Sequence, residues 1–208
     1  MEKVFSDKYL GDILSSNGSN SLNLKERIGK GIGKINEIIG ILDTISFGHQ
    51  YFRILVQLRE AMFINSILTN VDIWMGVKES DMNELENLDR SLLRKAFRCP
   101  VTTPKEACHL ELGLVTIGSL IKARRANYFH YLVNSEREGM LYKFFLAMYD
   151  NPSKDDWTTQ ALSDLKDLNI KDDFLYLKST SETKFKNMAK ISVREYTLDK
   201  LNEEKFEH

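Results

Sequence analysis

Apolar residues recur at three- and four-residue spacing along most of this chain, which is the period of amphipathic helices. Three such segments follow one another: one starts near residue 22 with Ser21 as its N-cap, and the others cover about residues 50–74 and 81–97. The middle segment is apolar nearly all round, which is typical of a central helix. Short connections then predict an antiparallel three-helix bundle. The apolar stripe of the first helix comprises Leu24, Ile28, Ile32, Ile35, Ile39 and Leu42.

Shorter elements flank this predicted bundle. Before it, Val4–Phe5 and Tyr9–Leu10 read as two short strands of a β-hairpin, followed by the turn sequence SSNGSNS. After it, Thr103 to Glu106 reads as a capping box with Pro104 at the first helical position, and further helices run to the C-terminus. The predicted fold class is therefore mainly α, with an N-terminal hairpin at 1–20, the bundle at 21–99 and a second helical region at 100–208.

The composition indicates a folded protein but does not indicate a particular activity. The chain has 208 residues, 42% of them hydrophobic, and a net charge of -1, so it can bury a core and any nucleic-acid signal must be local. Two cysteines indicate a reducing compartment. The N-terminus carries no apolar run, and no segment reaches the roughly 18 apolar residues of a membrane span. We expect an intracellular protein, cytoplasmic or nuclear, with no membrane partner.

The first helix carries a basic stripe. Arg27, Lys30 and Lys34 stand at i, i+3 and i+7 and therefore share a helix face, with Lys25 nearby. Gly29, Gly31 and Gly33 alternate through the same turns, and each costs about 1 kcal/mol of helix propensity relative to alanine. Close approach to a phosphate backbone would offset that cost. A solvated basic face, with glycines packed on a neighbouring helix, explains the same pattern.

A second basic cluster combines Lys122, Arg124 and Arg125 with Tyr128 and His130. Arginines beside aromatic rings can stack on bases, so Arg124 and Arg125 are candidate nucleic-acid contacts. The alternative is a helix that buries Tyr128 and solvates its arginines.

The sequence nominates no catalytic residue, cofactor or metal site. The spacing of Cys99, Cys108, His109 and His130 matches no standard zinc motif. The acidic pair at 155–156 fits helix N-terminal charge compensation, and the pair at 172–173 lies in a polar connection. GKGIGK lacks the strand–turn context and the glycine spacing of a dinucleotide-binding motif.

Four blocks resemble reverse transcriptases of non-LTR (LINE-type) retrotransposons. They are Lys8 to Gly11 with the following SSNG turn, Leu24 to Gly40, Leu58 to Trp74 (LREAMFINSILTNVDIW) and Pro104 to Gly113 (PKEACHLELG). The similarity continues through YKFF at 142–145 and the segment 151–157 to Lys184, and it covers nearly the whole chain in one order. The resembling part of that family is the C-terminal thumb and the helical region after it.

The resemblance implies a role in holding template and primer. Tyr9, Leu10 and Gly11 would belong to the edge of the palm, and Arg27, Lys30 and Lys34 would lie on the thumb helix that faces the duplex. The expected partner is RNA, DNA or an RNA–DNA duplex, bound without sequence specificity through Lys25, Arg27, Lys30, Gly31, Lys34, Arg124 and Arg125.

This sequence also departs from the family, and we therefore do not expect the polymerase reaction of that family from it. The catalytic palm of an RNA-directed DNA polymerase binds two metal ions through an Asp-Asp motif, which this sequence lacks. We therefore expect a truncated, non-catalytic chain without cofactors. A second hypothesis is a helical interaction protein that self-associates through the surface once covered by the palm, near Phe5, Tyr9 and Leu10. An unrecognised enzyme is the third, and no residue pattern nominates its site.

Overall fold

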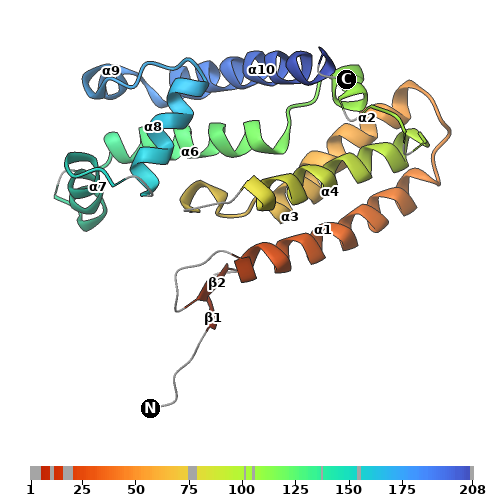
Figure 1. The fold of residues 1–208 in the computed structure, drawn as a ribbon, viewed down its shortest axis with the longest axis horizontal. Coiled ribbons are helices and arrows are strands. Elements are labelled where there is room, and N and C mark those ends of the chain that lie inside the picture. Colours follow the sequence, from red (N-terminus) through yellow and green to blue (C-terminus); the bar gives the residue numbers. More distant parts are fainter. Residues whose placement is uncertain are drawn as a thin grey trace. The chain divides into compact units, whose positions relative to one another are not determined.

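The computed structural model describes residues 6–9, 12–15, 21–74, 79–100, 102–104, 106–136, 138–153 and 156–206. Within them the chain is mainly helical (Figure 1), as the hydrophobic periodicity predicts. The chain divides into two compact units, one formed by residues 1–70 and 77–117 and the other by residues 71–76 and 118–208.

The first unit begins with two short strands, β1 (Ser6–Tyr9) and β2 (Asp12–Ser15), which pair antiparallel with Ser6 opposite Ser15 (Figure 1). Val4, Phe5, Leu10 and the turn at 16–20 lie outside the described residues. The strand positions inferred from the sequence therefore stay a prediction.

The helices of the first unit surround one apolar core. They are α1 (Ser21–Leu42), α2 (His49–Leu58), the π-helical turn η1 (Arg59–Ile64), α3 (Asn65–Ile67), α4 (Glu79–Phe97) and α5 (Ala107–Leu112). α1 packs against α4 and against the run from α2 to α3, while α5 packs against α4. Fully buried core side chains include Ile38, Leu42, Leu55, Phe63, Ile67, Leu85 and Leu92.

The buried face of α1 is rotated from the predicted one. Leu24, Ile35 and Leu42 are buried as expected, but Ile32 is 51% exposed, and Ile38 is buried in place of Ile39. Two apolar stripes lie side by side on this helix, and the position of Gly31 determines which of them is buried. A helix approaches a neighbour most closely where it carries no side chain, so the face that contains Gly31 turns inward.

The predicted second helix is broken. A π-helical turn follows α2, the helix ends at Ile67, and Asn70 adopts a positive φ of 56° before the short 3-10 helix η2 (Val71–Ile73). Apolar periodicity continues across the break, which is why the sequence does not reveal it. The predicted capping box at 103–106 is also wrong, since α5 begins at Ala107 and its N-cap, Glu106, makes no side-chain capping bond.

The second unit packs five helices around an aromatic core: α6 (Ile117–Val133), α7 (Met140–Asp150), α8 (Trp157–Asp167), α9 (Phe174–Ser179) and α10 (Glu182–Phe206). Rings of Phe129, Phe145 and Trp157 pack with centroids 5.3 to 6.2 Å apart. Trp157 Nε1 also donates to the carbonyl oxygen of Asp72 at 2.7 Å, which anchors η2 in this unit. Across both units, none of the described helices is long and apolar enough to cross a bilayer.

Candidate nucleic-acid interface

Three lysines line the solvent side of α1. Lys25 and Lys30 are exposed and Lys34 is partly exposed. Lys30 Nζ lies 2.7 Å from Glu26 Oε1, and Lys34 Nζ lies 2.7 Å from Glu37 Oε2. Surface pairs of this kind contribute about 0–1 kcal/mol, so both lysines can exchange a carboxylate for a phosphate at little cost.

Arg27 does not belong to this exposed face, and its predicted place there is wrong. Its side chain is 3% exposed, and Nη1 donates to the carbonyl oxygen of Ser66 on α3 at 3.2 Å. Arg27 stands one turn before Gly31, on the face that packs against the core. The i, i+3, i+7 pattern therefore contributes two exposed cations rather than three, because the first position points into the unit.

The glycines of α1 fall into two groups. Gly31 is buried, and a Cβ atom there would clash with Leu88 Cδ2 and lie 3.0 Å from Ile67 Cγ2, so this glycine permits helix packing and its predicted contact with nucleic acid is wrong. A Cβ on Gly29, Gly33 or Gly40 would meet no heavy atom within 4 Å among the described residues. These three positions, at i, i+4 and i+11, share one side of the helix.

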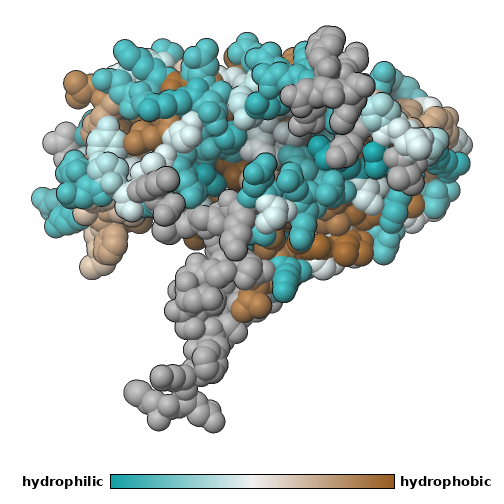
Figure 2. Space-filling view, viewed as in Figure 1, coloured by the Kyte–Doolittle hydropathy of each residue, from teal (hydrophilic) through white to brown (hydrophobic). Residues whose placement is uncertain are grey.

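The exposed surface of α1 is therefore bare backbone bordered by cations. Gly29 and Gly33 form its centre, and Lys25 and Lys30 flank them. Apolar side chains also reach solvent along this helix, and Figure 2 shows brown side chains on the surface that α1 forms. The exposed ones are Leu22, Ile32 and Ile41.

The second predicted basic cluster, on α6, also contains both a buried and a partly exposed arginine. Arg125 is buried, and its Nη1 lies 3.0 Å from Asp164 Oδ2. Lys122 Nζ contacts Asp164 and Asp167 at 3.2 and 2.6 Å. Burial raises the pKa of Asp164, and the two cations oppose that rise. Arg125 thus holds α6 to α8, which does not fit its predicted contact with nucleic acid. Arg124 is partly exposed and lines a pocket.

A buried charge cluster in the first unit escaped the sequence analysis. Arg59 Nε donates to Asp89 Oδ1 at 2.8 Å, and Arg59 Nη2 donates to Asp89 Oδ2 and to the carbonyl oxygen of Val115. His109 Nε2 lies 3.1 Å from Asp89 Oδ2. The cluster joins η1, α4, α5 and the segment after α5. One signal was present, since Asp89 occupies the apolar stripe of α4 between Leu85 and Leu92.

The electrostatics of this cluster are those of a structural ion pair. Burial alone would raise the pKa of Asp89, but the charge and hydrogen bonds of Arg59, aided by His109, lower it to about 2. Burial disfavours the charged form of Arg59, and Asp89 more than compensates, so the pKa of Arg59 is raised. Each partner thus keeps the other ionised inside the core.

The side chains considered for metal binding have other contacts. His109 faces Asp89, and His130 Nε2 lies 2.9 Å from the carbonyl oxygen of Thr180. Burial raises the pKa of the Cys108 thiol, and neighbouring Cys99 adds to the rise. Within the described ranges, His, Cys, Asp and Glu form no group of three or more that could hold a metal ion. Asp156 and Asp173 act as N-caps of α8 and α9.

No protein-family model, curated protein sequence or solved structure matches this chain.

Proposed function

We propose that this chain binds nucleic acid through the exposed face of α1, in the manner of a reverse transcriptase thumb and without catalysis of its own. The observation that carries the proposal is the bare backbone at Gly29 and Gly33 beside Lys25, Lys30 and Lys34. The ligand is the sugar–phosphate backbone of RNA, DNA or an RNA–DNA duplex. The arrangement of α1, the α2–α3 run and α4 corresponds in this proposal to the three-helix thumb, with β1 and β2 as the palm-edge hairpin.

Helix energetics support this use of the face. A glycine inside a helix costs about 1 kcal/mol relative to alanine. For Gly31 the close packing against Leu88 and Ile67 offsets that cost. Gly29 and Gly33 have no such contact within the described part of the chain. A ligand that approaches the helix backbone closely supplies the missing interaction, because a side chain there would hold it away.

The charges on the face suit a polyanion. A phosphate that replaces Glu26 or Glu37 as the partner of a lysine also displaces condensed counterions, and their release favours binding at low salt. Because the contacts reach phosphates rather than base edges, affinity should depend weakly on sequence.

Replacing the three lysines tests the proposal directly. In Lys25→Gln/Lys30→Gln/Lys34→Gln, the slope of log affinity against log salt should flatten by about 2 to 3, since each lost phosphate contact removes roughly 0.9. The measurement is fluorescence anisotropy with a labelled RNA–DNA duplex at several salt concentrations.

A matched variant controls for overall charge. Lys184→Gln/Lys190→Gln/Arg194→Gln also removes three exposed cations, but from α10 in the second unit. It should leave the salt slope close to that of the unmodified chain. Equal flattening in both triple variants would show that α1 is not the binding face.

The second candidate function is a helical interaction protein that self-associates. The observation in its favour is the exposure of Leu22, Ile32 and Ile41 along α1. The sequence predicted the self-associating surface near Phe5, Tyr9 and Leu10. The structure does not describe Phe5 and Leu10, nor the side chain of Tyr9, so this prediction stays untested. Light scattering distinguishes the two functions, because self-association predicts a mass that rises with concentration in the absence of nucleic acid.

A further inference from the structure

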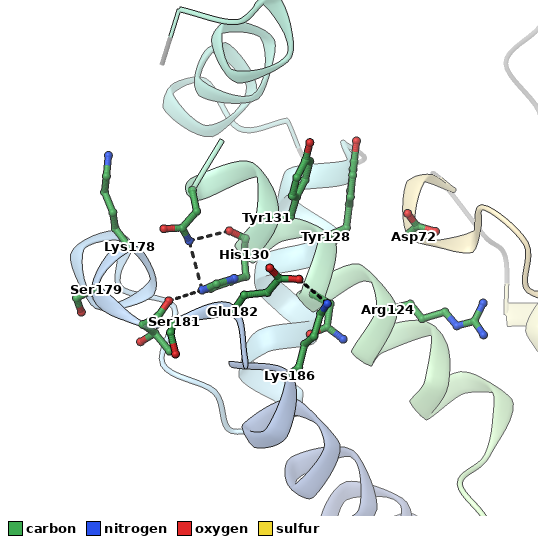
Figure 3. A pocket seen from close by; sticks show the side chains of 13 residues that line it. Asp72, Arg124, Tyr128, His130, Tyr131, Lys178, Ser179, Ser181, Glu182 and Lys186 are labelled. Atoms are coloured by element: carbon green, nitrogen blue, oxygen red, sulfur yellow. Dashed lines mark hydrogen bonds and ion pairs between the residues drawn. The ribbon is translucent and has the colours of Figure 1, made fainter. Parts of the chain in front are cut away.

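A pocket of about 760 Å³ opens in the second unit, where α6 faces the end of α9 and the start of α10 (Figure 3). This volume lies within the range of small-molecule sites. His130 fixes two of its walls, since its Nε2 lies 2.9 Å from the carbonyl oxygen of Thr180 and its ring stacks on Phe185 at 4.2 Å. These contacts tie α6 to α10, so the pocket is part of the folded unit.

An aromatic stack forms one side of the pocket. The rings of Tyr128 and Tyr131 are nearly parallel, with centroids 5.8 Å apart and planes 19° apart. Figure 3 shows the two rings side by side and projecting in the same direction from α6. The ring of Tyr128 also packs nearly perpendicular to that of Trp157, with centroids 5.5 Å apart, whereas Tyr131 is 56% exposed. Tyr131 is therefore the exposed end of a stack that Trp157 supports through Tyr128, and another planar group can extend the stack there.

Cationic side chains also line the pocket. Arg124, Lys178 and Lys186 line the pocket, together with two carboxylates, Asp72 and Glu182. Lys186 Nζ pairs with Glu182 Oε1, and both side chains are exposed, so the pair is weak. Three cations against two carboxylates leave a local excess of positive charge, which favours an anionic ligand.

We propose that this pocket binds a nucleobase together with its phosphate. The base stacks on the outer side of Tyr131 and extends the Tyr128–Tyr131 stack, while Lys178 or Lys186 contacts the phosphate. A stacked aromatic platform beside cations is the combination that binds single-stranded nucleic acid, because every base has a π-face and every linkage carries a negative charge. The bound base and phosphate belong either to a nucleotide within a single strand or to a free nucleotide.

This inference goes beyond the proposed function, since it concerns another unit and another form of ligand. Its test is therefore made in the background Lys25→Gln/Lys30→Gln/Lys34→Gln, in which α1 lacks its exposed cations. Failure of the pocket and failure of the α1 interface are then separate results.

The decisive variants change Tyr131. Tyr131→Ala should weaken binding of a labelled oligouridylate by roughly tenfold, within the range of a lost base–aromatic contact. Tyr131→Phe keeps the ring and should bind nearly as the parent does. Phe144→Ala, which removes another exposed aromatic side chain (67% exposed) from the same unit, is the matched control and should have no effect.

Anisotropy with the oligouridylate and calorimetry with adenosine monophosphate separate the two sources. Binding of the oligonucleotide that needs the ring of Tyr131 supports a strand as ligand, and Tyr131-dependent binding of the monophosphate alone supports a free nucleotide. Two outcomes overturn the proposal: no binding of either probe at low salt, or binding that Tyr131→Ala and Phe144→Ala affect equally.

Discussion

Replacing Asp89 by alanine should lower the free energy of unfolding of the first unit by about 3 to 5 kcal/mol, the cost of leaving one charge of a buried pair without its partner. Asp89 is fully buried and holds Arg59 through two hydrogen bonds, with His109 at 3.1 Å. Without the carboxylate, the Arg59 guanidinium stays in the core and keeps, among the described residues, its hydrogen bond to the carbonyl oxygen of Val115. Urea denaturation followed by circular dichroism measures the loss.

An exposed pair of the same unit is the control for this variant. Asp43→Ala removes the partner of Arg98, whose Nη2 lies 3.4 Å away with both side chains exposed, and should change stability by less than about 1 kcal/mol. Equal losses in the two variants would contradict the structural role of the buried cluster.

Acid denaturation offers a second readout of the same cluster. The pKa of Asp89 is depressed in the folded state, so its stabilisation is complete above its ordinary value near 4 and is lost as pH falls through about 2. The loss should amount to about 2 kcal/mol. Asp89→Asn should lack this component of the pH dependence.

Leucine at the exposed glycines should separate stability from binding. Gly29→Leu/Gly33→Leu should stabilise α1 by about 1 to 2 kcal/mol, because leucine is a strong helix former and neither Cβ would meet a heavy atom of the described residues within 4 Å. The same variant should bind the RNA–DNA duplex at least about tenfold more weakly, a loss of roughly 1.4 kcal/mol, since the side chains hold the phosphate backbone away. Thermal denaturation and fluorescence anisotropy measure the two effects.

Gly31→Leu is the contrasting substitution on the same helix. Its side chain would enter the space of Leu88 and Ile67, so it should destabilise the first unit by about 1 to 3 kcal/mol through overpacking. If Gly29→Leu/Gly33→Leu binds the duplex with unchanged affinity, close backbone approach is not the purpose of the exposed glycines.

Local sequence signals predicted the helical class and the positions of α1 and α4, because both helices have an apolar stripe bounded by polar connections. They did not predict which stripe of α1 is buried. That choice depends on Gly31 meeting Leu88, a residue far along the chain. The break before η2 depends on the backbone at Asn70, and apolar periodicity runs through it.

The candidate nucleic-acid interface on α1 was also predicted only in part, because the sequence does not show which residues far apart in the chain come into contact. Spacing placed Arg27 with Lys30 and Lys34, but spacing does not say on which side of their common face the core lies. The pocket beside Tyr131 combines α6 with α9 and α10, so only the folded unit reveals it. Asp89 shows a rule of wider use: a carboxylate on an apolar stripe requires a buried partner, here Arg59.

A titration of the isotope-labelled chain with an RNA–DNA duplex, followed through its amide resonances by NMR at low salt, tests the central claim most directly. The account predicts that the amides of Gly29 and Gly33 and of the neighbouring Lys25 and Lys30 shift most as duplex is added. Gly113 and Gly139, which lie outside α1, serve as internal references and should barely move. Saturating duplex that leaves the α1 amides unchanged would contradict the proposal that this helix holds nucleic acid.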